Sequence, residues 1–171
     1  MKSIIIRDNF EFRYINKEET DQAINLEQIC FPPNEACSPK NMTIRIEKAA
    51  EQFLVAVDKK TGKIAGFLNG LTTNEKKFRD EFFTDADLYN KDGDTIMILG
   101  LVVHPDYRLN GLARELVKQY SIREKERGRK EALLTCLDDR VPMYLKFGFT
   151  DKGIADSTWG GEEWHEMSLM F

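Results

Sequence analysis

Histidine, cysteine and long apolar runs are scarce in this sequence of 171 residues, and each scarcity excludes a class of protein. Only 2 histidines and 3 cysteines are present, and Cys30, Cys37 and Cys136 lack the spacing of a zinc site or a disulfide framework. We therefore expect no metal. The first ten residues contain no signal-like apolar core, and no stretch approaches the roughly 18 apolar residues of a membrane span. The sequence predicts a cytoplasmic protein without a membrane partner.

An excess of basic residues is also missing. Lysine and arginine number 25 against 29 aspartates and glutamates, which gives a net charge of -4. The most basic stretch, residues 123–130, also contains acids, so a nucleic-acid partner is not expected. The hydrophobic content of 42%, with 11% aromatics, is enough to fill the core of one domain of this length. We expect a single domain over residues 1–171.

The hydrophobic periodicity predicts an α/β fold. Strands are expected at residues 10–15, 53–57, 64–71, 95–103, 132–137 and 163–171, and helices at residues 17–30, 38–52 (or 41–52), 111–127 and 140–146. Residues 72–93 are expected to form an excursion with a short helix. The continuous apolar run at residues 95–103 is typical of a central strand buried on both faces, and it can pair in parallel with residues 132–137. Within this run, Gly100 predicts a bulge that splays the strand from its neighbour.

A basic turn that contains a glycine lies between the central strand and the helix at residues 111–127. The free N–H groups of the first helical turn favour an anion, Gly111 allows the backbone to approach it, and Ala113 adds little bulk. Arg108 and Arg114 would add charge-assisted hydrogen bonds. Taken alone, an ordinary capped turn explains the same residues. The P-loop spacing and the three-glycine dinucleotide fingerprint are both absent, so an ATPase or a nicotinamide enzyme is not indicated.

Together with the residues around it, this turn resembles the corresponding segments of the GNAT acetyltransferases. Their cofactor signature is Gln or Arg, two residues, Gly, one residue, then Gly or Ala, and residues 108–113 match it. Residues 101–107 are similar to the strand and turn that precede the signature, and residues 141–149 are similar to a later block of the family. The spacing from Cys136 through Asp138 to Val141, Pro142 and Tyr144 is similar to that of the arylalkylamine (serotonin) N-acetyltransferase branch.

The resemblance implies an α/β GNAT fold, with a mixed central sheet of about six to seven strands flanked by about four helices. It also implies direct transfer of an acetyl group from acetyl-CoA to a primary amine, with a small molecule as the acceptor, and it leaves a homodimer open. The pantetheine arm would pair with the central strand, and the pyrophosphate would lie on the turn. The cofactor-binding residues so implied are Leu101, Val102, Val103, Arg108, Leu109, Asn110, Gly111, Leu112, Ala113 and Arg114.

Tyr144 falls where family members carry the general acid, and its phenol is reasonably matched to the departing thiolate. The alternative is an aromatic that only packs on the sheet. The resemblance also implies that residues 31–41 cover the acceptor. The substrate contacts expected are Phe31, Glu35, Met97 and Leu99.

The general base is the point where this chain departs from the arylalkylamine branch. That branch carries two histidines on the central strand, and the matching positions here hold Met97 and Leu99, which cannot accept a proton. A water chain to Glu35, Asp94 or another carboxylate could replace the base, or the amine could arrive neutral. His104 and His165 are expected to be structural or exposed.

Three other functions stay open at this point. A protein N-terminal or lysine acetyltransferase would use the same donor, although the excursion at residues 72–93 favours a closed site and a small acceptor. A noncatalytic acyl-CoA-binding domain would keep the turn and lose the acid–base groups. An unrelated α/β domain would only mimic the strand, turn and helix.

Overall fold

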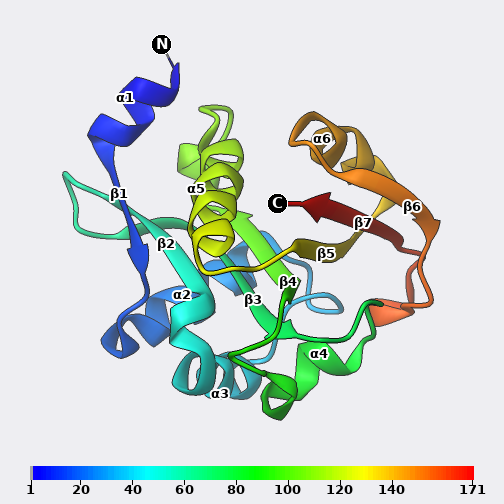
Figure 1. Ribbon diagram of the computed structural model, residues 1–171. Helices are drawn as coiled ribbons and strands as arrows, with labels where there is room; N and C mark the ends of the chain where they lie inside the picture. The colour runs from blue at the N-terminus through cyan, green and yellow to red at the C-terminus, as the bar shows by residue number, and fades with distance from the viewer. Residues whose placement is uncertain (1) are drawn as a thin grey trace.

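A mixed seven-stranded sheet forms the centre of the molecule (Figure 1). The computed structural model describes residues 2–171, with side chains from Ile6 onward. The strand order is β1-β2-β3-β4-β5-β7-β6, and β4 and β5 are the parallel pair within otherwise antiparallel ladders. The strands are β1 (Phe10–Tyr14), β2 (Phe53–Asp58), β3 (Ile64–Thr73), β4 (Thr95–Val103), β5 (Glu131–Cys136), β6 (Thr150–Ile154) and β7 (His165–Met170).

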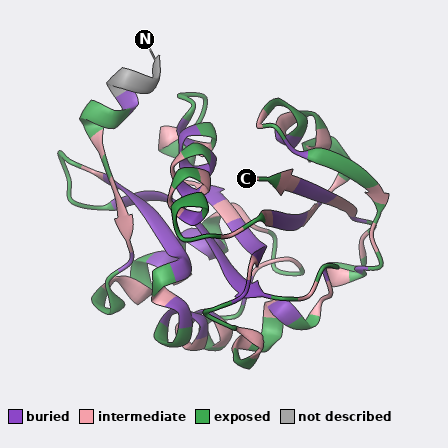
Figure 2. Ribbon diagram, in the orientation of Figure 1, coloured by how far each residue is buried: buried purple, intermediate pink, exposed green. Residues whose placement is uncertain are grey.

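Helices cover both faces of this sheet. They are α1 (Lys2–Asn9), α2 (Thr20–Cys30), α3 (Pro39–Ala49), α4 (Glu81–Thr84), α5 (Leu112–Glu126) and α6 (Val141–Lys146). On one face, Leu116 and Tyr120 of α5 and Tyr144 of α6 join a core cluster with Ile96 and Ile98 of β4. On the other face, side chains of α2 and α3 pack on β2 and β3 in a second cluster. The buried residues, purple in Figure 2, lie on the sides of the helices and strands that pack against one another.

The central strand β4 is regular only over its first half. Its ladder with β5 ends at Met97, opposite Leu133, and β5 then diverges from it. On the other side, Asn69 of β3 pairs with Gly100 while Gly70 pairs with Ile98, so Leu99 has no partner on β3 and forms a bulge. The bulge expected at Gly100 is therefore confirmed, and it lies where the two parallel strands separate.

Most of the expected elements are confirmed, including the hairpin of β2 and β3, the buried strand β4 and the parallel pairing of β4 with β5. Six α-helices are present in residues 2–171, rather than about four, because α1 and the single turn α4 add to the number. Strand β6 was not expected from the sequence; it lies at the edge of the sheet, pairs with β7 and has mostly exposed residues. No helix of the described chain is both long and apolar enough to cross a membrane.

Candidate functional site

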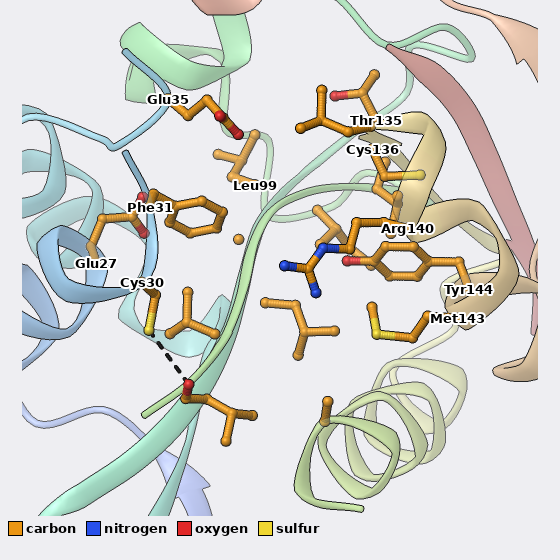
Figure 3. Close-up of a pocket in the computed structure, with 18 of the residues that line it drawn as sticks. Glu27, Cys30, Phe31, Glu35, Leu99, Thr135, Cys136, Arg140, Met143 and Tyr144 are labelled. Carbon is orange, nitrogen blue, oxygen red and sulfur yellow. Dashed lines mark hydrogen bonds between the residues drawn. The ribbon is translucent and has the colours of Figure 1, made fainter. Parts of the chain in front are cut away.

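A cavity of about 590 Å³ opens where β4 and β5 separate. Residues on both faces of the sheet line this cavity, because it extends through the gap between the two strands. Figure 3 shows Glu27, Cys30 and Phe31 on one side of the β4 ribbon, and Tyr144, Met143, Arg140 and Cys136 on the other. The volume is within the range of small-molecule sites in proteins. Residues 98–103 of β4 line the cavity between the two sides.

The edge of β4 presents backbone hydrogen-bonding groups to this cavity. The backbone N–H of His104 donates to the carbonyl of Ala65 on β3. Because backbone groups alternate along a strand, the N–H and carbonyl of Val102 also point to β3, and those of Leu101 and Val103 point away from it. The carbonyl of Val103 accepts instead from the Cys30 thiol at 3.5 Å and from Arg108 Nε at 3.1 Å. Since β5 has already diverged, the strand edge at residues 101–103 can pair with an extended ligand.

The turn after β4 has the backbone geometry of an anion site. Leu109 and Gly111 both have positive φ, of 65° and 80°, on either side of Asn110. Among the side chains that the structure describes, from Ile6 onward, none caps the start of α5, and the first intrahelical bond runs from the N–H of Glu115 to the carbonyl of Gly111 at 3.1 Å. The N–H groups of the preceding helical turn are therefore free to bind an anion.

The residues expected to hold the cofactor are brought together around this turn. The lining includes Leu101, Val102, Val103, Arg108, Leu109, Gly111, Leu112, Ala113 and Arg114. Asn110 is the exception, since it lies outside the cavity and its side-chain amide donates to the carbonyl of Tyr107 at 3.4 Å.

Tyr144 is buried in the wall of the cavity that α6 supplies. Its ring makes edge contacts with Phe147 and Phe149, at centroid distances of 6.0 and 5.4 Å. Its hydroxyl points into the cavity, beside the guanidinium of Arg140 (Figure 3). Burial raises the pKa of the phenol well above its usual value, the nearby Cys136 adds to the shift, and Arg140 opposes it. The phenol therefore keeps its proton at neutral pH.

On the opposite side, a loop after α2 closes the cavity with a carboxylate and aromatic rings. Glu35 lines this part, and burial together with the neighbouring Glu162 and Asp139 raises its pKa to about 7, against the opposing effect of Arg140. The carbonyl of Glu35 accepts from the indole N–H of Trp159 at 2.9 Å. The same indole packs against the ring of Phe83, with a distance of 4.8 Å between the ring centroids. The partly buried carboxyl group thus changes its charge near neutral pH, in a part of the cavity that aromatic side chains also line.

The expected acceptor contacts divide into two groups. Phe31, Glu35 and Leu99 line the cavity. Met97 does not line it: its side chain is fully buried and packs with Phe82 and Leu133, because β4 and β5 are still paired at this level of the sheet. We therefore correct Met97 from an acceptor contact to a core residue.

The two histidines and Asp94 lie outside the cavity. His104 Nδ1 accepts from the N–H of Asp106 at 3.1 Å. His165 lies between Asp138 and Asp151, and the hydrogen bond to Asp151 raises its pKa. Asp94 binds Lys76 and Lys130 at the surface. Of the base candidates named from the sequence, only Glu35 has access to the cavity.

Several lining residues were missed by the sequence analysis, namely Glu27, Cys30, Phe83, Thr135, Arg140, Trp159 and Trp164. Phe83 packs against the core cluster that contains its neighbour Phe82, and it also lines the cavity. For Glu27 a signal was present. It follows Ala23 by four residues and precedes Cys30 by three, so it shares the inward face of α2.

Residues 20–149 match the model of the acetyltransferase (GNAT) family. This chain belongs to that family. The match covers α2, α3, β4, the turn after it, α5 and α6, and so includes most of the cavity wall described above. No curated protein matches the sequence of this GNAT chain.

Solved structures with the same fold cover almost the whole chain. The loading GNATL domain of CurA from Lyngbya majuscula superposes with a TM-score of 0.77 and 14% identity, over 94% of this chain and 97% of that one. The PaiA N-acetyltransferase from Thermoplasma acidophilum, in complex with coenzyme A, gives 0.70 and 15%, over 95% and 99%. The ribosomal-protein-S18-alanine N-acetyltransferase from Escherichia coli gives 0.67 and 19%, over 94% and 93%. Identities this low show the GNAT fold alone, and the likeness to the arylalkylamine branch stays a prediction.

Proposed function

We propose that this chain is an acetyl-CoA-dependent N-acetyltransferase that transfers acetyl directly to a primary amine of a small molecule. The observation that carries the proposal is one cavity that contains the free edge of β4, an anion-binding turn and the Tyr144 hydroxyl. A strand edge next to an anion site suits a ligand that has amide groups and a pyrophosphate. The family match and the coenzyme A bound to PaiA support the same donor.

The donor would lie along β4 with its pyrophosphate on the turn. Its pantetheine amides would hydrogen-bond to the carbonyl of Leu101 and the N–H of Val103, which point away from β3. The first-turn N–H groups of α5 and the side chains of Arg108 and Arg114 would hold the pyrophosphate. Gly111 lets the backbone approach that anion closely because it has no side chain.

The reaction forms a bond between the amine nitrogen and the thioester carbon, and breaks the bond from that carbon to sulfur. The N–H of Leu101 would stabilise the negative charge that develops on the carbonyl oxygen. Tyr144 would give its proton to the departing sulfur. The resulting phenolate would be stabilised by Arg140, which already lowers the pKa of this phenol against the effect of burial.

The acceptor would enter on the side of Phe31, Glu35 and Leu99. Ionised Glu35 would attract the ammonium form of an amine, and the aromatic rings around it suit the same cation. Two hydrogen bonds tie the loop to the Trp159 segment, from Trp159 Nε1 to the Glu35 carbonyl and from Asn34 Nδ2 to the Gly160 carbonyl at 3.1 Å. On the ground of these two contacts across the outer part of the cavity, the proposal takes a small acceptor in preference to a protein terminus or lysine.

A thermal-shift series with acetyl-CoA, CoA and ATP tests donor binding, and thiol release with arylalkylamines, polyamines and peptides tests transfer. We expect both CoA species to stabilise the protein, with thiol release that depends on a small amine. Release that depends on peptides alone would favour a protein acetyltransferase. Stabilisation without turnover would favour a noncatalytic acyl-CoA-binding domain, and no stabilisation by either CoA species would contradict the proposal.

Tyr144→Phe tests the acid directly, because it removes the hydroxyl and keeps the ring that packs on Phe147 and Phe149. We expect kcat to fall by roughly 100-fold while acetyl-CoA binding is retained. Tyr89→Phe is the matched control, since Tyr89 lies outside the cavity and its hydroxyl binds Glu51. Full activity of Tyr144→Phe would remove the acid assignment.

A further inference from the structure

Three buried polar residues lie together under the bulge of β4. Glu27 of α2, Arg45 of α3 and Asn69 of β3 are 4%, 3% and 1% exposed, respectively. They come from three different elements, and the roles proposed above for the donor, the acid and the acceptor loop use none of them. A buried carboxylate and a buried guanidinium are costly unless each is stabilised by partners, so their place in the core needs a reason.

One carboxylate oxygen of Glu27 accepts a hydrogen bond, and the other faces β4. Its Oε2 accepts from the N–H of Cys37 at 3.0 Å. Its Oε1 lies 3.6 Å from the position that a Cβ on Gly100 would occupy. Glu27 lines the cavity, and Figure 3 shows its side chain beside Phe31, on the acceptor side of β4. The free oxygen therefore lies beside the point where the strand edge opens.

Arg45 orients the amide of Asn69 toward the same point. Arg45 Nη1 donates to Asn69 Oδ1 at 3.2 Å, and Nη2 donates to the carbonyl of Phe83 at 2.9 Å. This leaves Asn69 Nδ2, which lies 3.2 Å from the same Cβ position on Gly100, as a buried donor without a partner in the described chain. An oriented but unpaired donor next to a carboxylate oxygen is the arrangement that seats a water or a polar ligand atom.

We propose that Glu27 is the general base of the transfer, and that it takes the proton of the acceptor nitrogen at Oε1, directly or across one water seated on Asn69 Nδ2. This inference rests on the proposed function. The ammonium first gives one proton to Glu27, which passes it to solvent. As the nitrogen–carbon bond then forms and the carbon–sulfur bond breaks, the nitrogen gives its second proton to Glu27 while Tyr144 protonates the sulfur. Solvent then removes the proton from Glu27 and returns one to Tyr144, so the cycle balances.

Position distinguishes Glu27 from Glu35. Glu27 lies beside Gly100, next to the strand residues that would hold the thioester, whereas Glu35 is on the loop that closes the outer part of the cavity. Gly100 is needed at this point because any side chain there would lie between the carboxylate and the strand edge. Glu35 would attract the amine, and Glu27 would deprotonate it.

The surroundings of Glu27 determine the pKa of its carboxyl group. Burial raises its pKa, while the Cys37 N–H and the charge of Arg45 on α3 oppose the shift. The other titratable groups that face it are the thiols of Cys30 on α2 and Cys37 on the following loop. A base with a raised pKa accepts a proton from an ammonium more readily than an exposed glutamate does.

Glu27→Gln tests the proposal, because the amide can still accept from the Cys37 N–H but cannot take a proton. With an amine that the wild type acetylates, we expect kcat at pH 7 to fall about 100-fold, while the Kd of acetyl-CoA and the melting temperature change little. The loss should shrink as pH rises toward the pKa of the amine, since a neutral amine no longer needs the first of the two deprotonations. Glu27→Asp should recover part of the rate, and Glu18→Gln, on the exposed surface before α2, should match the wild type.

Two results would overturn the assignment of Glu27 while the proposed function stands. One is a kcat and a pH profile of Glu27→Gln equal to those of the wild type. The other is a raised amine KM with an unchanged kcat profile, which would make Glu27 a docking charge. If the wild type binds acetyl-CoA but acetylates no amine at any pH, the proposed function fails, and the role of Glu27 fails with it.

Discussion

The raised pKa of Glu35 predicts that amine binding depends on pH near neutrality. With a pKa of about 7, the carboxyl is about one-tenth ionised at pH 6 and about nine-tenths ionised at pH 8. A carboxyl with the ordinary value of 4.5 would be ionised throughout this range. If the ionised form attracts the ammonium group, the amine KM of the wild type should fall by up to about ninefold from pH 6 to pH 8.

The assay is a series of amine KM measurements between pH 6 and pH 8, with an acceptor whose own pKa is above about 9.5 so that it remains an ammonium ion. Glu35→Gln should have a high KM that does not change with pH. Glu162→Gln should move the midpoint below 7, because it removes a carboxyl that faces Glu35, whereas Glu163→Gln, exposed at the next position, should leave it in place. A wild-type KM that is constant from pH 6 to pH 8, or a dependence that persists in Glu35→Gln, would refute this reasoning.

Three further predictions concern the turn and the buried carboxylate. Gly111→Ala should lower the free energy of unfolding by about 1 kcal/mol, measured by urea denaturation, because φ of 80° is strained for any residue with a Cβ; unchanged stability would contradict this. Arg108→Gln should raise the Kd of acetyl-CoA about tenfold in a calorimetric titration, as expected for one lost charge-assisted hydrogen bond, and an unchanged Kd would place the pyrophosphate elsewhere. The folded-state pKa of Glu27 is raised, so the wild type should lose stability as pH rises above about 4.5, and Glu27→Gln should lack this loss; parallel stability curves from pH 4 to pH 8 would contradict it.

The donor half of the site could be predicted because its signals are local in the sequence. The apolar run of β4, the turn at Arg108 and Gly111, and the amphipathic α5 follow one another without interruption, so each element supports the next. The resemblance placed Tyr144 with them, and it lies in the same cavity wall. These elements depend on neighbouring residues, which a single sequence displays directly.

The acceptor half depends on contacts between distant segments. Glu27, Arg45 and Asn69 are of residue types that usually lie at the surface. Its spacing places Glu27 on the inward face of α2, but only the packing of α2, α3 and β3 buries the three side chains together. The place of Met97 outside the cavity could not be predicted either, since it depends on how far the ladder of β4 with β5 extends. The edge strand β6 was missed because its exposed residues do not alternate between apolar and polar.

The central claim, acetyl transfer from acetyl-CoA to an amine, is tested most directly by the mass of the acceptor after incubation with the protein and isotopically labelled acetyl-CoA. We expect an acceptor amine heavier by one labelled acetyl group, formed by the wild type and at least 100-fold more slowly by Tyr144→Phe. Release of CoA with no labelled amine among arylalkylamines, polyamines or peptides, or label found only on the protein itself, would contradict the account.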